Sequence, residues 1–336
     1  MFIEERGEIM KGRYRIMVQS PNVQFELCVQ RVITILRGDS GTGKTTLIDC
    51  IRSFNRQGKN SRVQIECEKK CRVLDNEDWE ERLDSIKDSI VFIDEECEFM
   101  HTEAFAKKVQ QSDNYFVLVS RESFPMLPYS ITEILGLRES KRYELAHSVY
   151  DETYQIYQGL CTKKVIEPNY IITEDKKSGF QFFSSLGIEC ISAEGKSNII
   201  KKLTGLKGKE VLIVADGAAL GSEAEAIMQK VKANNNITLY APESFEWILL
   251  QAKIFPSGYV NPRVLSETYN YADGIKYISW ERFYTAYLVY VTTKIKEEKA
   301  MDSFKYPSNK AVLPQAYFET NIRDKILEVM KQIKFK

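Results

Sequence analysis

The sequence lacks any long apolar run. None approaches the ~18 consecutive apolar residues that mark a membrane-spanning helix, and the opening Met-Phe-Ile-Glu-Glu-Arg lacks the apolar core of a signal peptide. We therefore expect a cytoplasmic protein without a membrane partner. The 336 residues are 43% hydrophobic and 28% charged, which suits a globular chain with room for two domains.

The sequence also lacks net charge. Lysine plus arginine total 47, and aspartate plus glutamate total 47. The chain therefore has no overall positive field with which to attract nucleic acid, although this balance is compatible with a local basic groove.

Histidine is scarce, and the cysteines are odd in number. The chain has two histidines and seven scattered cysteines, which argues against a disulfide framework. Cys67 and Cys71 are the only close pair, and zinc would need two more ligands from a chain whose only histidines are His101 and His147. We expect free thiols.

A glycine-rich turn is the most informative stretch. Residues 31–37 form a β-branched apolar run, residues 38–46 form the turn, and residues 46–51 have helical spacing. The turn reads G-x-x-x-x-G-K-[ST], and this pattern between a strand and a helix is typical of a phosphate-binding loop. The alternative is a glycine turn that matches by chance.

The loop residues predict specific roles. Gly38, Gly41 and Gly43 allow positive φ, so that backbone N–H groups can surround phosphate oxygens. Lys44 is expected to reach the β- and γ-phosphates, and Thr45 to coordinate Mg²⁺. The predicted nucleotide-binding residues are Gly38, Asp39, Ser40, Gly41, Thr42, Gly43, Lys44, Thr45 and Thr46.

An acidic pair follows a second apolar run. Residues 89–93 have the composition of a buried parallel strand, and Asp94 and Glu95 come directly after it. Asp94 is expected to bind Mg²⁺, and Glu95 to polarise the attacking water. Glu96 and Glu98 compete with Glu95 for that catalytic role.

A third apolar run, residues 114–119, ends at Ser120 and Arg121. The alternation of strands and helices predicts a parallel sheet covered by helices. With the phosphate loop and the Asp94-Glu95 pair, this domain resembles the additional-strand class of P-loop NTPases, which implies ATP and Mg²⁺ as cofactors. In that class a polar residue at this strand end senses the γ-phosphate, which makes Ser120 the candidate.

Three arginines are candidate arginine fingers, in cis or from a neighbouring subunit: Arg121, Arg138 and Arg142. Surface ion pairs are the alternative for each. No LSGGQ-like stretch is present, so a transporter-type ATPase head is not supported.

The chain before the loop predicts a β-hairpin. Residues 13–19 and 23–29 alternate apolar and polar side chains around a turn at residues 20–22. Tyr14 or Phe25 could stack on a base, but packing in the sheet is the simpler interpretation. We assign residues 1–150 to the P-loop domain and residues 151–168 to a linker.

A second α/β unit follows the linker. The predicted strands are 170–175, 188–192, 210–217 and 237–240, and the predicted helices are 179–186, 197–203 and 223–231. Over about 75 residues this order resembles a toprim domain, the Mg²⁺-binding module of topoisomerases, primases and OLD-type nucleases.

The toprim resemblance implies a metal site with one departure. Glu174 follows the first strand and Asp216 the third, where the family places a glutamate and a D-x-D pair. The second aspartate of that pair is Ala218 here. Glu174 and Asp216 could still hold one Mg²⁺, with Asp175 or Glu223 as a third ligand. The alternative is a degenerate domain kept for structure or binding.

We assign residues 169–245 to this toprim-like domain and residues 246–336 to a mainly helical region packed on it. Residues 280–296 and 322–333 have helical spacing. The many aromatic residues of this region could stack on the bases of single-stranded nucleic acid, but a packed apolar helix face is the simpler interpretation.

The sequence thus predicts an Mg²⁺-dependent ATPase whose nucleotide state gates a toprim-like domain acting on nucleic acid, as in phage defence or mobile elements. The alternative is a nucleotide-dependent sensor or assembly ATPase, homo-oligomeric or bound to a partner protein, whose second domain is inactive. A small-molecule kinase is a third reading without an identifiable acceptor pocket.

Overall fold

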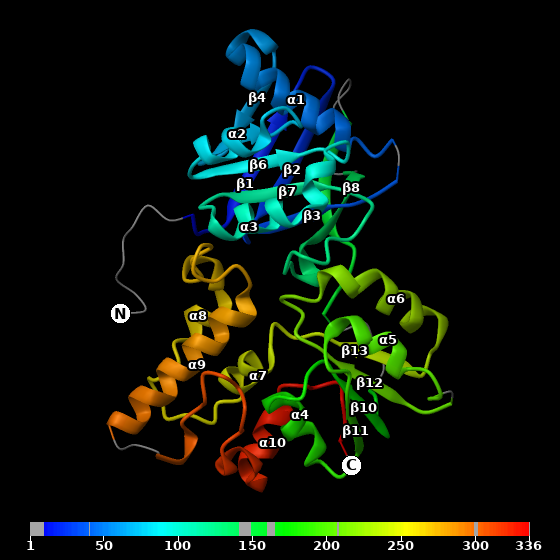
Figure 1. Cartoon of the computed structure of the whole chain (residues 1–336), viewed down its shortest axis with the longest axis vertical. Helices are drawn as coiled ribbons and strands as arrows, with labels where there is room; N and C mark the ends of the chain where they lie inside the picture. The colour runs from blue at the N-terminus through cyan, green and yellow to red at the C-terminus, as the bar shows by residue number, and fades with distance from the viewer. Residues whose placement is uncertain are drawn as a thin grey trace. The chain divides into compact units, whose positions relative to one another are not determined.

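The structure, a computed structural model, describes residues 10–39, 41–140, 149–159, 165–206, 208–298 and 302–335. The chain forms two compact units (Figure 1). Unit 1 runs through Ile156 and includes Tyr269–Ser279, and unit 2 comprises Tyr157–Thr268 and Trp280–Lys336.

Unit 1 is built on a mixed sheet that has nine strands within the described residues. In spatial order these are β4 (Gln64–Glu66), β1 (Tyr14–Gln19), β2 (Val23–Val29), β9 (Val149–Gln155), β8 (Ile134–Glu139), β3 (Ile33–Leu36), β7 (Tyr115–Val119), β6 (Ser89–Ile93) and β5 (Lys70–Val73). Strands β8, β3, β7, β6 and β5 are mutually parallel.

The predicted strands of unit 1 follow their apolar patterns. Every residue of β3, β6 and β7 is buried, as expected for parallel strands that are covered on both faces. Strands β1 and β2 pair antiparallel and alternate buried with more exposed positions, so the predicted hairpin is confirmed. Tyr14 and Phe25 are buried, which favours sheet packing for both.

The predicted linker differs from the structure. Its first residues belong to β9, which pairs parallel with β2 and antiparallel with β8, so unit 1 continues to Ile156 and its sheet is mixed. Strand β8 has no clear apolar strand pattern in the sequence, because Gly136 interrupts its run of apolar residues. A Cβ at Gly136 would lie 2.6 Å from the ring of Tyr154, the residue opposite it on β9. The glycine therefore lets this ring cover the strand.

The helices of unit 1 are α1 (Lys44–Gln57), α2 (Trp79–Ser85) and α3 (Glu103–Gln111). Helix α1 buries Leu47, Ile48 and Ile51, the apolar residues at helical spacing after the glycine turn. Thr102 caps α3, since its side chain accepts a hydrogen bond from the N–H of Phe105.

Unit 2 contains a fully parallel four-stranded sheet among its described residues. Its order is β11 (Glu189–Ser192), β10 (Tyr170–Thr173), β12 (Val211–Val214) and β13 (Ile237–Tyr240). Its helices are α4 (Ser178–Ser184), α5 (Ile199–Lys202), α6 (Ala224–Ala233), α7 (Phe245–Gln251), α8 (Pro262–Ser266), α9 (Trp280–Glu297) and α10 (Thr320–Glu328). The predicted order of strands and helices is confirmed.

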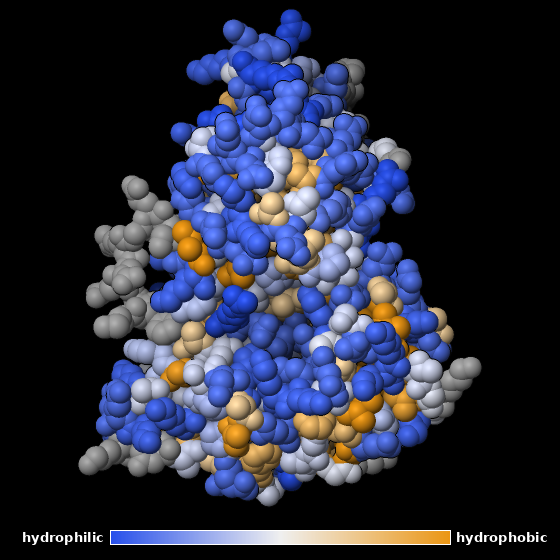
Figure 2. Space-filling view, in the orientation of Figure 1, coloured by the Kyte–Doolittle hydropathy of each residue, from blue (hydrophilic) through white to orange (hydrophobic). Residues whose placement is uncertain are grey.

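The C-terminal helices pack on one another in unit 2, where α7 contacts both α9 and α10. Helix α9 buries a continuous apolar face that includes Phe283, Tyr287 and Val291. This burial favours the packed helix face over base stacking for these residues. On the face in Figure 2, hydrophobic residues occur as scattered small groups. Within the described ranges, every helix is too short or too polar to cross a lipid bilayer.

Candidate functional site

The glycine loop of unit 1 has the backbone conformation that its sequence predicts. Gly41 and Gly43 have φ of 82° and 87°, in the left-handed region, and Gly38 has φ of 155°. Helix α1 begins at Lys44, and the carbonyl of Gly43 accepts the first helical hydrogen bond, from the N–H of Leu47 at 2.9 Å. The loop therefore ends at the N-terminus of a helix, and the N–H groups and dipole of a helix N-terminus favour the binding of anions.

The ammonium of Lys44 lies inside this loop. Its Nζ donates hydrogen bonds to the carbonyls of Gly38 at 2.7 Å and Asp39 at 2.8 Å, and to Oγ1 of Thr42 at 2.9 Å. Only 5% of Lys44 is exposed. Burial lowers the pKa of Lys44, and the negative charge of Glu95 opposes this effect. A cation is thus held in the concavity where phosphate oxygens were predicted.

The loop is open at Gly41, Thr45 and Thr46. No atom of the described residues lies within 4 Å of a Cβ built at Gly41, and Thr45 and Thr46 are exposed in the first turn of α1. Ser40, another predicted contact, lies outside the described residues. Open backbone, a lysine and exposed hydroxyl groups are the donors that a triphosphate with Mg²⁺ requires, so these residues fit that ligand.

The acidic residues lie at the same edge of the sheet. Leu36 of β3 is level with Val119 of β7, and Ile93 of β6 is level with Leu118 of β7, so the three parallel strands end together. Asp94 follows β6 directly and is 5% exposed. Burial raises its pKa, whereas the N–H of Glu95, which donates to Oδ1 of Asp94 at 2.8 Å, lowers it.

Glu95 is paired with an arginine that the sequence also singled out. Nε of Arg121 lies 3.5 Å from Oε2 of Glu95, and both side chains are partly exposed. The charges of Glu95, Arg121 and Asp94 all act on Lys44. The structure therefore brings together four of the predicted residues, Lys44, Asp94, Glu95 and Arg121. The two competing acids, Glu96 and Glu98, are exposed.

Ser120 reaches the expected strand end but is engaged in a local turn. It is 3% exposed, and its Oγ accepts the N–H of Glu122 at 3.0 Å and donates to the carbonyl of Glu122 at 3.3 Å. Arg138 forms an ion pair with Glu152 at 3.0 Å, which matches the surface-pair alternative. Arg142 lies outside the described residues.

One residue beside the loop was missed by the sequence interpretation. Asp151 on β9 is buried, and burial raises its pKa, with the charge of Glu139 adding to the effect. A Cβ at Gly43 would lie 3.1 Å from Oδ2 of Asp151 and 3.2 Å from Cε1 of Phe25. No local pattern could have revealed this contact, because it depends on the placement of β9 next to β2.

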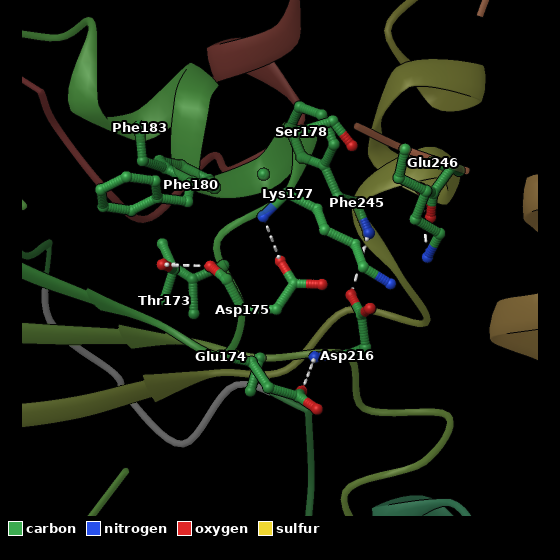
Figure 3. Close-up of a pocket in the computed structure, with 14 residues that line it drawn as sticks. Thr173, Glu174, Asp175, Lys177, Ser178, Phe180, Phe183, Asp216, Phe245 and Glu246 are labelled. Carbon is green, nitrogen blue, oxygen red and sulfur yellow. Dashed lines mark hydrogen bonds and ion pairs between the residues drawn. The ribbon is translucent and has the colours of Figure 1, made fainter. Parts of the chain in front are cut away.

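In unit 2, Glu174 and Asp216 line one pocket. Register pairing of Thr173 with Val214 brings the ends of β10 and β12 together. Figure 3 shows Glu174 reaching the backbone of Asp216, whose N–H donates to Oε2 of Glu174 at 3.0 Å. Asp216 points toward Phe245, whose N–H donates to Oδ1 of Asp216 at 3.1 Å.

Both carboxyl groups have raised pKa values. Burial raises the pKa of Glu174 to about 7, although the N–H of Asp216 opposes the shift. Burial also raises the pKa of Asp216 well above its ordinary value, and the charge of Glu281 adds to this, while Lys310 lowers it.

Lys310 supplies positive charge to the pocket. Its Nζ lies 2.8 Å from Oε1 of Glu281 and 3.3 Å from Oε1 of Glu246. Glu246 is fully buried, and Tyr306 donates to the same Oε1 at 2.7 Å. Among the described residues, none forms a hydrogen bond with Oε2 of Glu246. Sequence reasoning missed Lys310 because 136 residues separate it from Glu174 (310 − 174).

The described residues do not add a third carboxylate ligand to Glu174 and Asp216. Among the residues that the structure describes, no three aspartate, glutamate, histidine or cysteine side chains lie together in a way that could hold a metal ion. Ala218 is 2% exposed, and its N–H is bonded to the carbonyl of Glu243 at 3.2 Å. We therefore derive no metal chemistry from Glu174 and Asp216.

Comparisons of the chain with protein families, curated proteins and solved structures found no match. The function must therefore be argued from the residues of these two sites.

Proposed function

We propose that unit 1 binds a nucleoside triphosphate with Mg²⁺ and hydrolyses it. The observation that carries this proposal is the position of Lys44, buried inside a left-handed glycine loop and within electrostatic reach of Asp94 and Glu95. A lysine in such a loop, with two consecutive acids after another strand of the same sheet, is the arrangement that phosphoryl transfer needs.

Each residue has a defined part in the proposed reaction. Lys44 exchanges its bonds to the loop carbonyls for bonds to phosphate oxygens, because anionic oxygens are stronger acceptors than neutral carbonyls. Thr45 and Asp94 would hold Mg²⁺, which would neutralise phosphate charge when bound. Glu95 orients water and accepts its proton, and its pair with Arg121 keeps it at the mouth of the loop.

The strand order supports the same proposal. Strand β7 lies between β3, which leads into the loop, and β6, which leads into the acids. An extra strand at this position gives the additional-strand class of P-loop NTPases its name, and the sequence resembles that class. This is a likeness of fold, and the function rests on the site residues.

The test separates binding from turnover. Lys44→Ala should abolish binding of a fluorescent ATP analogue, whereas Lys107→Ala, an exposed lysine on α3, should leave it unchanged. Glu95→Gln should bind normally and release phosphate about 10²–10⁴-fold more slowly. Glu96→Gln is the matched control and should retain the parental rate. Parental turnover by Glu95→Gln would refute the role of Glu95 as base.

For unit 2 we propose a binding role without metal-dependent cleavage. The specific observation is that Lys310 lies among the pocket carboxylates while position 218 carries no acid. This favours a nucleotide-dependent sensor or assembly ATPase, in which unit 2 binds a partner, over a nuclease. Mg²⁺-dependent nicking of DNA or RNA by the intact chain that is lost in Asp216→Ala would contradict this assignment.

A further inference from the structure

Another pocket, in unit 1, has four arginines among its nine lining residues. It lies between α1, β5 and α2 and has a cavity volume of about 280 Å³. Its arginines are Arg52 and Arg56 from α1, Arg72 from β5 and Arg82 from α2. Asp75 is the one acid among the lining residues that the structure describes, so their formal charge is +3 (four arginines minus one aspartate).

Three of these guanidinium groups are not neutralised. Asp75 is engaged by Arg52, whose Nε and Nη2 lie 3.3 Å and 3.1 Å from Oδ1 of Asp75. In the part of the chain that the structure describes, Arg56, Arg72 and Arg82 form no ion pair. Arginines from three separate elements therefore face one hollow without a protein carboxylate to balance them.

The floor of the pocket excludes a peptide strand as ligand. Strand β5 is at the edge of the sheet, where its free backbone groups could pair with another strand. Asn55 already covers this edge, because its Nδ2 donates to the carbonyl of Cys71 at 2.9 Å and its Oδ1 accepts the N–H of Val73 at 3.0 Å.

We propose that this arginine pocket binds the phosphodiester backbone of nucleic acid. Guanidinium groups bind phosphate oxygens with two parallel hydrogen bonds and remain charged at all physiological pH values. None of the described lining residues is aromatic, so bases are not held by stacking and the contact carries no sequence information. A local site of this kind would let a chain of zero net charge hold a polyanion.

The proposal goes beyond nucleotide hydrolysis, and it can be tested without nucleotide. Fluorescence anisotropy would measure binding of labelled single-stranded DNA, duplex DNA and RNA to the whole chain between 50 and 200 mM salt, without Mg²⁺ or ATP. The test variant carries Arg56→Gln, Arg72→Gln and Arg82→Gln. The control removes three charges elsewhere in unit 1 through Lys11→Gln, Arg15→Gln and Lys107→Gln.

The salt dependence gives the expected size of the effect. Three phosphate contacts on duplex DNA contribute a slope of about −2.7 in log affinity against log salt, which is a roughly 40-fold loss between 50 and 200 mM. For single strands the corresponding slope is about −2.1, or roughly 18-fold. In the variant with the three arginines replaced by glutamine, the slope of log affinity against log salt should become shallower by this amount for every nucleic-acid sequence tested. The control variant should keep the slope of the unmodified chain.

Several outcomes would overturn the proposal. These are a wild-type chain that binds no nucleic acid at 50 mM salt, an unchanged slope in the arginine variant, and equally tight arginine-dependent binding of a poly-glutamate peptide. Replacing the same arginines with lysine retains the charge. An unchanged slope in this lysine variant would assign the loss in the glutamine variant to charge, whereas an equal loss in both variants would assign it to lost packing and overturn the proposal. Lys44→Ala should leave nucleic-acid binding intact, which separates this test from that of hydrolysis.

Discussion

Replacing Gly43 with alanine tests how tightly the glycine loop is packed against the sheet. Gly43 has φ of 87°, where an alanine costs about 1–2 kcal/mol. Its new Cβ would also lie 3.1 Å from Oδ2 of Asp151 and 3.2 Å from Cε1 of Phe25. Forcing a methyl group into such a contact costs about 1–3 kcal/mol more. We expect Gly43→Ala to destabilise unit 1 by about 2–5 kcal/mol.

Gly41 offers a matched control two residues away. Its φ is 82°, nearly the same, but a Cβ there meets no atom within 4 Å. Gly41→Ala should therefore show only the backbone cost of about 1–2 kcal/mol. The difference between the two variants isolates the contact with β2 and β9, because the backbone strain and the entropy gained by the unfolded chain are common to both.

Differential scanning calorimetry is the appropriate measurement, since it can resolve separate transitions of two units. For a unit of this size each kcal/mol lowers Tm by about 2–4 °C. Adding Asp151→Ala should recover part of the loss in Gly43→Ala and none in Gly41→Ala, because only Gly43 approaches that carboxylate. If Gly43→Ala is no less stable than Gly41→Ala, the packing of the loop against Asp151 and Phe25 is wrong.

Two further predictions concern the pocket of unit 2. Lys310→Met should destabilise unit 2 by about 3–5 kcal/mol in urea unfolding, because it leaves buried carboxylates without their cation. Lys305→Met, at an exposed position, should leave the free energy of unfolding nearly unchanged. Equal effects of the two substitutions would contradict the role of Lys310. The raised pKa of Glu174, about 7 against an ordinary 4.5, means that the folded state binds its proton more tightly, so this group's contribution to stability falls as pH rises from about 4.5 to 7. This loss of stability is about 3 kcal/mol. Glu174→Gln should remove it and so flatten the curve of unfolding free energy against pH by that amount. An unchanged curve in Glu174→Gln would show that Glu174 does not cause the pH dependence.

Much of the secondary structure could be predicted because its signals are local. The glycine loop is specified by Gly41, Gly43 and Lys44, which are close in the chain and adopt the expected turn and helix start. The strands of unit 2 are short apolar runs separated by helical patterns, and runs of that kind require burial in a parallel sheet. Residues at the ends of such strands, among them Glu174 and Asp216, could be located for the same reason.

Other strands were hidden because their own residues carry too weak a signal. Strand β5 alternates Lys70 and Arg72 with Cys71 and Val73, but four residues are too few for this alternation to distinguish a strand from a polar loop. Strand β8 contains Gly136, which only makes sense once Tyr154 is known to cover it. In both cases burial by a neighbouring element, and not local composition, makes the segment a strand.

The sequence by itself therefore determined the glycine loop, the acids at the strand ends and the alternation of strands and helices, because spacing along the chain is enough to specify each of them. Only the tertiary structure decided that Asp151 lies against Gly43, that Lys310 enters the carboxylate pocket, and that arginines of α1, β5 and α2 share one hollow. These arrangements join residues that are far apart in the chain. They arise from the order of strands in a sheet and the packing of helices on it, for which no short stretch of sequence carries a signal.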